Sequence, residues 1–199
     1  MKKFIAITSI ISAFAASSAL AKTEGNFVEL DILQVHSSNK YQINEKDTDT
    51  AKFKDSSLGF GVSYKHAFNL DRIFLAPGVF FDRLGTEAKQ SGDNAAAQYR
   101  YGAKLDIGYD FTEKFAAYLT NGISNVKYKI NWSGVNGAES DSKLGYFIGL
   151  GSSYKVAKDV SVNLEYNMQS LLVDTPDKTG AVKLRSNIGV LKLGVSYNF

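Results

Sequence analysis

The last nine residues, Leu191-Lys192-Leu193-Gly194-Val195-Ser196-Tyr197-Asn198-Phe199, alternate between apolar and polar side chains without a break. Successive side chains of a strand point to opposite faces, so this segment would have one apolar face and one polar face along its whole length. The sequence then ends at an aromatic residue. This pattern is typical of a strand that closes a barrel in a membrane, where the apolar face meets lipid and the polar face meets the lumen.

The first residues have the composition of a secretory signal peptide. Met1-Lys2-Lys3 is a short basic start, a mostly apolar stretch runs from Phe4 to Ala16, and Ala19-Leu20-Ala21 supplies the small residues of a cleavage site. We therefore predict a signal peptide over residues 1–21 and a barrel domain over residues 22–199. The alternative is a membrane-anchoring helix, which the apolar stretch disfavours because it is shorter than the roughly 18 residues that a span requires.

Charge and composition narrow the class of protein. Residues 1–21 hold two of the 23 Lys and Arg and none of the 20 Asp and Glu, so residues 22–199 have a formal charge of +1. This balance gives no support to nucleic-acid binding, and no nucleic-acid partner is expected. The chain has no cysteine, which excludes a disulfide framework, and its 17 glycines and 13% aromatic residues suit an all-β domain with tight turns.

Apolar and polar residues alternate in seven further segments, which makes eight strands in all. Pro77 cannot donate a hydrogen bond to a neighbouring strand, so we expect a bulge or a local gap there. Between Thr120 and Asn125 the alternation changes phase, and Gly122 is the expected site of a bulge. The seven segments are Phe27–His36, Ser57–Lys65, Ile73–Leu84, Tyr99–Tyr109, Phe115–Ile130, Leu144–Tyr154 and Val160–Gln169.

The connections alternate in length, as they do in an outer-membrane barrel. Three tight turns on one side and four polar loops on the other predict an eight-stranded antiparallel up-and-down transmembrane β-barrel with periplasmic termini. A soluble sandwich or lipocalin-like barrel is the alternative, and it would bury the apolar face. The turns are Ala67–Arg72, Phe111–Lys114 and Val156–Asp159, and the loops are Ser37–Ser56, Gly85–Ala97, Asn131–Ser142 and Asp174–Ala181.

Aromatic residues gather near both sets of connections, which predicts two girdles at the two membrane interfaces. The girdle near the turns would contain Tyr64, Phe74, Tyr109, Phe111, Phe115, Tyr154, Tyr197 and Phe199. The girdle near the loops would contain Phe81, Tyr99, Tyr101, Tyr128 and Trp132.

Three segments carry a resemblance to a known family: Phe74-Leu75-Ala76-Pro77-Gly78-Val79, the turn Gly108 to Lys114, and the ending Gly194 to Phe199. Together with the signal peptide, they resemble the small eight-stranded outer-membrane barrels of Gram-negative bacteria. This is the opacity-protein and OmpX-like group, which includes rickettsial-type surface adhesins. The resemblance implies an outer-membrane location and contact with outer-membrane lipid. It also implies that Tyr197 and Phe199 form the signal read by the barrel-assembly machinery, and that the loops bind host-surface proteins.

Charged residues on the polar faces would meet inside the barrel. An eight-stranded barrel is only wide enough for its own side chains to fill, so opposite charges there are expected to pair. This network would act as a polar plug, and a conduit for ions or protons is the alternative. Its predicted members are Glu29, Asp31, Lys104, Asp106, Glu165 and Lys192.

No residue pattern predicts an enzyme, a metal site or a cofactor. The only histidines, His36 and His66, are expected at opposite ends of the barrel, and neither has the setting of a catalytic base. The acids Glu45, Asp47 and Asp49 alternate in a way that could ligate calcium, but lysines stand beside them and the glycine of a calcium loop is missing.

The loops are the remaining candidates for function, with Tyr41, Ile43 and Trp132 as possible contacts. Rigid scaffolds often carry binding on such loops, so adhesion or host-ligand binding is the leading hypothesis. A narrow channel or transporter for small compounds and a purely structural membrane barrel are the alternatives.

Overall fold

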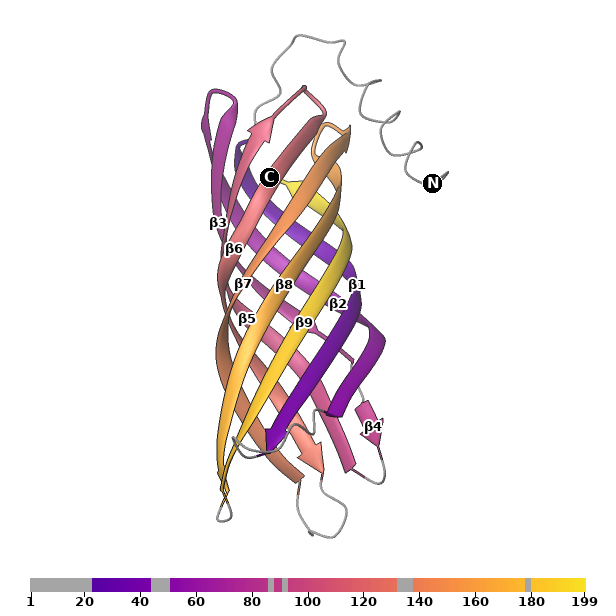
Figure 1. The fold of residues 1–199 in the computed structure, drawn as a ribbon. Coiled ribbons are helices and arrows are strands. Elements are labelled where there is room, and N and C mark those ends of the chain that lie inside the picture. Colours follow the sequence, from indigo (N-terminus) through magenta and orange to yellow (C-terminus); the bar gives the residue numbers. More distant parts are fainter. Residues whose placement is uncertain (1–22, 44–50, 86–87, 91–92, 132–137, 178–179) are drawn as a thin grey trace, which may run out of the picture.

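The computed structural model describes residues 23–43, 51–85, 88–90, 93–131, 138–177 and 180–199. Side chains are described over 23–37, 56–85, 97–127, 142–171 and 187–199. The described residues form nine strands (Figure 1). They are β1 (Gly25–Ile43), β2 (Ala51–Leu70), β3 (Ile73–Arg83), β4 (Ala88–Gln90), β5 (Asp93–Asp110), β6 (Phe115–Asn131), β7 (Ala138–Ala157), β8 (Val160–Asp177) and β9 (Gly180–Asn198).

Eight of these strands close into one antiparallel barrel. The order is β3-β2-β1-β9-β8-β7-β6-β5, and pairing of β3 with β5 from Ile73↔Tyr109 to Arg83↔Tyr99 closes it. The three short turns and the C-terminus lie at one end (Figure 1). The predicted eight-stranded barrel is therefore confirmed. In the described residues, no helix is long and apolar enough to cross a membrane.

The short strand β4 was not expected from the sequence. It pairs only with the start of β5, from Ala88↔Ala95 to Gln90↔Asp93. The segment predicted as one loop, Gly85–Ala97, is thus partly a small hairpin beyond the end of β3.

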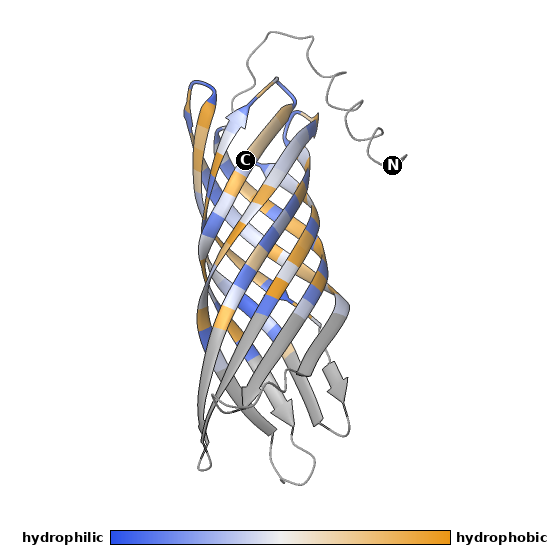
Figure 2. Cartoon of the chain, in the orientation of Figure 1, coloured by the Kyte–Doolittle hydropathy of each residue, from blue (hydrophilic) through white to orange (hydrophobic). Residues whose placement is uncertain are grey.

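Apolar and polar residues alternate along the strands (Figure 2), and their exposure shows that they point to opposite sides of the barrel wall, as the sequence predicts. On the outside, Leu58 is 74% exposed and Leu144 is 70% exposed, whereas Arg100 and Asp106 on the inside are fully buried. The apolar residues therefore form the outer surface and the charges are enclosed. This arrangement contradicts the soluble sandwich or lipocalin-like alternative, which would enclose the apolar side chains.

Two predicted irregularities have different outcomes. Pairing of β2 with β3 is interrupted between Lys65↔Gly78 and Phe68↔Leu75, which confirms a local gap at Pro77. The prediction of a bulge at Gly122 is wrong, because β6 pairs in continuous register with both β5 and β7 around this residue. Val126 therefore points into the barrel, where it is fully buried.

The lumen contains two apolar clusters that the sequence did not predict. Both consist of buried side chains on inward positions of the strands, so the inner face is less polar than expected. The loop-side cluster comprises Leu33, Val35, Leu84, Ala97, Val126, Leu171, Ile188 and Val190. The turn-side cluster comprises Phe27, Ala67, Phe74, Ala76, Ala116 and Tyr118.

The aromatic girdle near the turns needs one correction. Phe74 was expected in that girdle but points inward and is only 2% exposed. Tyr64, Tyr109, Phe111, Tyr197 and Phe199 are exposed on the outer surface as expected. Near the loops, Phe81 and Tyr101 are exposed, whereas Trp132 and the side chain of Tyr128 lie outside the described residues.

The strands extend further toward the loops than the sequence suggests. Pairing of β1 with β2 continues to Tyr41↔Ala51, and pairing of β8 with β9 continues to Asp177↔Gly180. The loop predicted over Ser37–Ser56 is therefore mostly regular hairpin. Alternation is visible in these extensions, as in Ala51-Lys52-Phe53-Lys54 and Val182-Lys183-Leu184-Arg185, but lysine and arginine occupy the polar positions and these stretches were not predicted as strands.

Candidate functional site in the barrel lumen

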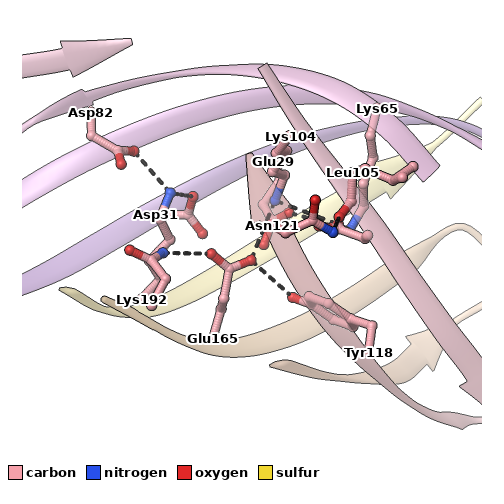
Figure 3. A network of polar contacts seen from close by, with 12 residues as sticks. Glu29, Asp31, Lys65, Asp82, Lys104, Leu105, Tyr118, Asn121, Glu165 and Lys192 are labelled. Atoms are coloured by element: carbon pink, nitrogen blue, oxygen red, sulfur yellow. Dashed lines mark hydrogen bonds and ion pairs between the residues drawn. The ribbon is translucent and has the colours of Figure 1, made fainter. Parts of the chain in front are cut away.

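A layer of buried charged side chains occupies the lumen between the two apolar clusters (Figure 3). Six strands contribute to it, namely β1, β2, β3, β5, β8 and β9, and every member is at most 6% exposed. Close pairing is required, because an isolated charge would be very unfavourable there. We call this set the ionic layer; it comprises the carboxylates Glu29, Asp31, Asp82, Asp106 and Glu165 and the cations Lys65, Arg100, Lys104 and Lys192.

Asp82 is the centre of one half of the ionic layer. Arg100 donates from Nε to Asp82 Oδ2 at 2.8 Å, and Lys192 donates from Nζ to Asp82 Oδ1 at 2.9 Å. Lys192 also lies 3.7 Å from Asp31 Oδ2. The Asp82 carboxylate on β3 thus joins β5 to β9 across the lumen, and Lys192 joins β9 to β1 through Asp31.

Asp106 is the centre of the other half. Its Oδ2 lies 3.0 Å from Lys65 Nζ and 3.5 Å from Lys104 Nζ. Lys65 also approaches Glu29 Oε2 at 3.8 Å, and Lys104 approaches Glu165 Oε2 at 3.3 Å. Each cation of this half therefore contacts two carboxylates on different strands.

Two neutral side chains complete the surroundings of Glu165. Asn167 donates from Nδ2 to Glu165 Oε1 at 2.8 Å, and the Tyr118 hydroxyl donates to Glu165 Oε2 at 3.4 Å. Tyr118 also belongs to the turn-side cluster, and its ring lies 4.9 Å from Lys65 Nζ. It is therefore the residue that connects this cluster with the ionic layer.

All six residues proposed from the sequence lie in the ionic layer. The structure adds Lys65, Asp82 and Arg100 to them, and each stands on an inward position of its strand. The alternation of the sequence already places these three residues on the inward face of their strands. It does not show at which level of the lumen each one lies, because that depends on the stagger between strands.

Arg100 lies against two aromatic rings inside the barrel. The centre of its guanidinium is 5.4 Å from the ring centroid of Phe80 and 5.6 Å from that of Phe147. Lys192 Nζ lies 5.2 Å from the Phe80 ring. The terminal nitrogens of Arg100 have no hydrogen-bond partner among the described residues, so cation–π attraction provides part of their stabilisation.

Glycine creates the space for the carboxylates. A Cβ on Gly61 would collide with Asp82, and a Cβ on Gly194 would collide with Asp31. In the same way, a Cβ on Gly151 would collide with the ring of Tyr118, so glycine at these inward positions makes room for close packing in the lumen.

The mouth near the turns is crossed by the segment that precedes β1. Thr23 donates from its backbone N to Asp110 Oδ2 at 2.9 Å, and its hydroxyl donates to Asp110 Oδ1 at 2.5 Å. Asn69 donates to the same carboxylate at 3.2 Å. A cavity of about 30 Å³ lies beside these residues, with Phe27, Lys114 and Lys155 in its lining. This volume is enough for about one water molecule.

The remaining candidate residues lie away from the lumen or outside the described part. Tyr197 and Phe199 are exposed on the outer surface of the last strand. Trp132 lies outside the described residues, as do the side chains of Tyr41 and Ile43.

The two histidines stand on different parts of β1 and β2. His36 lies toward the loops, opposite Ser56, and His66 lies near the turns, where its Nδ1 is 2.9 Å from Asn26 Oδ1. Among the side chains that the structure describes, no group of three or more His, Cys, Asp and Glu could hold a metal ion.

Comparisons with known proteins identify the family. The model of the outer membrane protein beta-barrel domain matches residues 6–199. Outer membrane protein A of Klebsiella pneumoniae is 32% identical over 168 residues, which is 81% of this chain and 45% of that protein. The chain therefore spans about half the length of this relative.

Solved structures share the fold at low sequence identity. Neisserial surface protein A has a TM-score of 0.53 at 19% identity, covering 88% of this chain and 97% of its own. Ail of Yersinia pestis has a TM-score of 0.53 at 17% identity, covering 88% of this chain and 99% of its own. OprG of Pseudomonas aeruginosa has a TM-score of 0.55 at 15% identity, covering 90% of this chain and 98% of its own. With the match of the family model, these results show that the chain belongs to the outer membrane protein beta-barrel domain family and that its location is the outer membrane.

Proposed function

We propose that this outer-membrane barrel is a closed scaffold that binds ligands, host-surface proteins among them, through the loops at its extracellular end. One observation carries the proposal: the ionic layer is held between two apolar clusters, so that the lumen is filled by side chains at three successive levels. A filled lumen leaves the loop end as the surface for interaction. In this proposal the ionic layer is a plug, which maintains the shape of the barrel.

The strands at the loop end are longer than the membrane requires. A tilted transmembrane strand needs about 9–11 residues, whereas β1 has 19 and β9 has 19. The excess lies at the loop end, where β1–β2 and β8–β9 continue as paired hairpins (Figure 1). These paired extensions reach beyond the length that the membrane requires, which is a suitable geometry for contact with another surface.

The neighbours with the same fold support a binding role. The structure of Ail, the attachment invasion locus protein, was determined in complex with the heparin analogue sucrose octasulfate. The loops of this chain carry acids as well as lysines, for example Glu45 and Asp47 beside Lys46. A ligand recognised through such mixed charge need not be a polyanion. We therefore propose a protein ligand and retain Tyr41, Ile43 and Trp132 as the candidate contacts.

Replacing the loop tips by glycine and serine tests the adhesion proposal. Residues 41–50, 86–87, 132–137 and 178–179 would each be replaced in a barrel displayed on a non-adherent host bacterium. Binding to cultured host cells should fall for at least one of the four variants at equal surface amounts. A replacement of Thr112 and Glu113 in a periplasmic turn is the matched control. Unchanged binding by all four loop variants would remove the adhesion role.

Conductance in planar lipid bilayers tests the closed lumen separately. The wild-type barrel should be electrically silent, because the charges of the ionic layer are paired and both apolar clusters exclude hydrated ions. Steady single-channel currents would instead favour the narrow channel or transporter.

The exposed aromatic residues Tyr197 and Phe199, at and just beyond the end of β9, support the role of this segment as the assembly signal. Tyr197 is 54% exposed and Phe199 is 65% exposed, on the same outer face of the last strand. The variant Phe199→Ala should lower the amount of barrel that reaches the outer membrane, whereas Phe111→Ala, at an exposed aromatic residue in a turn, should not. Equal amounts for both variants and for wild type would contradict this role.

The contacts of Thr23 fit cleavage of a signal peptide after Ala21. Thr23 is bound to Asp110, so the barrel is anchored two residues beyond the predicted cleavage site. Mass spectrometry of protein isolated from outer membranes should find Lys22 as the first residue. A first residue beyond Thr23 would contradict both the cleavage site and a role for this anchor in the mature protein.

A further inference from the structure

The ionic layer contains one more negative charge than positive charge. It consists of five carboxylates and four cations, and an apolar cluster lies on each side of it. If every one of these side chains were ionised, the layer would carry a net charge of −1 inside the barrel. An unbalanced charge buried in this way is very unfavourable, so the layer needs one further positive charge.

The hydrogen bonds of the layer show where the excess negative charge lies. The four cations donate hydrogen bonds to only three of the carboxylates, which are Asp82, Asp106 and Glu165. The ion pair of Glu29 is with Lys65, at 3.8 Å. The ion pair of Asp31 is with Lys192, at 3.7 Å. These two ion pairs are the longest in the layer, and both lysines already donate to another carboxylate. Glu29 and Asp31 are therefore the least neutralised carboxylates of the layer.

The side chains of Glu29 and Asp31 meet in the recess that Gly194 leaves in the barrel wall. They are successive inward residues of β1, and Asp31 pairs in register with Gly194 of β9. A Cβ on Gly194 would collide with Asp31 Oδ1 and would lie 3.1 Å from Glu29 Oε1. One oxygen of each carboxylate therefore reaches the same small space. Asp31 is only 5% exposed, and its Oδ1 in this recess has no hydrogen-bond partner among the residues that the structure describes.

The groups that surround this pair of carboxylates supply no further positive charge (Figure 3). Their cations are the four already counted, and β7 contributes no charged side chain to the ionic layer. The charged and titratable side chains that face the pair are Lys65 on β2, Asp82 on β3, Arg100, Lys104 and Asp106 on β5, Tyr118 on β6, Glu165 on β8 and Lys192 on β9.

We propose that Glu29 and Asp31 bind one proton between them at neutral pH. One of the two carboxyl groups is protonated, and its O–H donates a hydrogen bond to an oxygen of the other, which stays ionised. Two carboxylates that share a buried site do not both ionise, because their like charges repel each other. The proton is taken up from water when the barrel folds and returns to water when it unfolds. With this proton, four negative charges balance four positive charges, independently of what the loops bind.

Infrared spectroscopy of the wild-type barrel tests the proposal directly. The barrel would be measured in vesicles of ether lipids, which have no ester carbonyl. At about pH 7 exposed carboxyl groups are ionised, so a carbonyl band of a protonated carboxylic acid should come from this pair alone. The band should disappear in Asp31→Asn and in Glu29→Gln. It should remain in the control Asp110→Asn, which removes a buried carboxylate at the mouth near the turns.

Urea unfolding over a range of pH measures the same proton through stability. The folded barrel holds one proton more than the unfolded chain, so a rise in pH favours unfolding while the folded state keeps the proton. Between about pH 5 and pH 7, the folding equilibrium constant of the wild type relative to that of Asp31→Asn should fall about ten-fold per pH unit. Both proteins contain His36 and His66, so the titration of the histidines cancels in this ratio.

Single and double substitutions should differ sharply at neutral pH. Asp31→Asn and Glu29→Gln should each be about as stable as the wild type, because each leaves four carboxylates for four cations. The double variant leaves only three carboxylates, and its folding equilibrium constant should be at least about a hundred-fold lower. A loss from each single variant as large as that from the double variant would overturn the proposal. So would the absence of the carboxylic acid band from the wild type, a result that depends on no variant.

Discussion

The ionic layer and the loop-side cluster lie on the same strands but are stabilised in different ways. On β1 the inward residue Asp31 belongs to the ionic layer, and the next inward residue, Leu33, belongs to the cluster. The layer depends on specific partners, since each charge is buried and must be neutralised. The cluster depends on filled volume, since any apolar side chain of suitable shape contributes to it.

This difference explains how a narrow barrel closes its lumen. Charges alone would attract water, and atoms such as Asp106 Oδ1 already have no hydrogen-bond partner among the residues that the structure describes. Apolar side chains on both sides keep water away from the layer, which strengthens its ion pairs. The apolar clusters therefore make the ionic plug effective, and the two parts should respond differently to substitution.

The largest effect is expected from removing the carboxylate that two cations share. The variant Asp82→Ala leaves Arg100 and Lys192 without their shared partner, and should lower the free energy of unfolding by about 3–5 kcal/mol. Denaturant titration of the barrel in lipid vesicles would measure it. The variant Glu113→Ala, in a periplasmic turn, is the control and should change little.

A conservative exchange at the same position sharpens the comparison. The variant Asp82→Asn keeps the shape of the side chain but cannot neutralise Arg100 and Lys192, so most of the loss should remain. If Asp82→Asn were as stable as the wild type, shape rather than charge would hold the ionic layer, and the contrast with the cluster would disappear.

A smaller but substantial effect is expected in the loop-side cluster. Leu171 is only 1% exposed, and Leu171→Ala should lower the free energy of unfolding by about 3 kcal/mol, through lost contacts and a residual cavity. Here the conservative exchange should be tolerated, with Leu171→Met losing less than about 1.5 kcal/mol. A loss from Leu171→Met as large as that from Leu171→Ala would contradict the dependence on volume.

A larger side chain should also destabilise the barrel at a position where a glycine contacts an aromatic ring. A Cβ on Gly151 would collide with the ring of Tyr118, so Gly151→Ala should lower the free energy of unfolding by about 1–3 kcal/mol. The neighbouring variant Ser152→Ala removes only a hydroxyl from the next position and serves as the control. Equal stability of Gly151→Ala and the wild type would show that Tyr118 moves freely.

The sequence predicted the outer wall better than the lumen, for a physical reason. Lipid favours apolar side chains, so most outward positions, such as Leu58 and Leu144, are apolar and give a clear alternation. The lumen accepts both kinds of residue as long as they fill it. At Val126 an apolar residue on an inward position therefore looked like a change of phase, although the strand is regular.

The ionic layer was only partly predictable for a similar reason. Alternation assigns Asp82 and Arg100 to the inside but does not say which strands bring them to the same height. That height follows from the stagger of the strands around the barrel, a property of the closed sheet rather than of any one segment. The pairing of Arg100 with Asp82 could therefore not be predicted from the sequence and is known only from the structure.

The smallest effect is expected at Tyr118, which belongs to the turn-side cluster and also contacts the ionic layer. The variant Tyr118→Phe keeps the ring in the turn-side cluster and below Lys65, and removes only the hydroxyl that donates to Glu165 at 3.4 Å. Glu165 retains Lys104 and Asn167, so the free energy of unfolding should fall by about 1 kcal/mol. Denaturant titration beside Tyr118→Ala separates the two roles. A loss from Tyr118→Phe as large as that from Asp82→Ala would mean that the hydroxyl is as essential to the ionic layer as a charge, and that the layer depends on hydrogen bonding more than on paired charges.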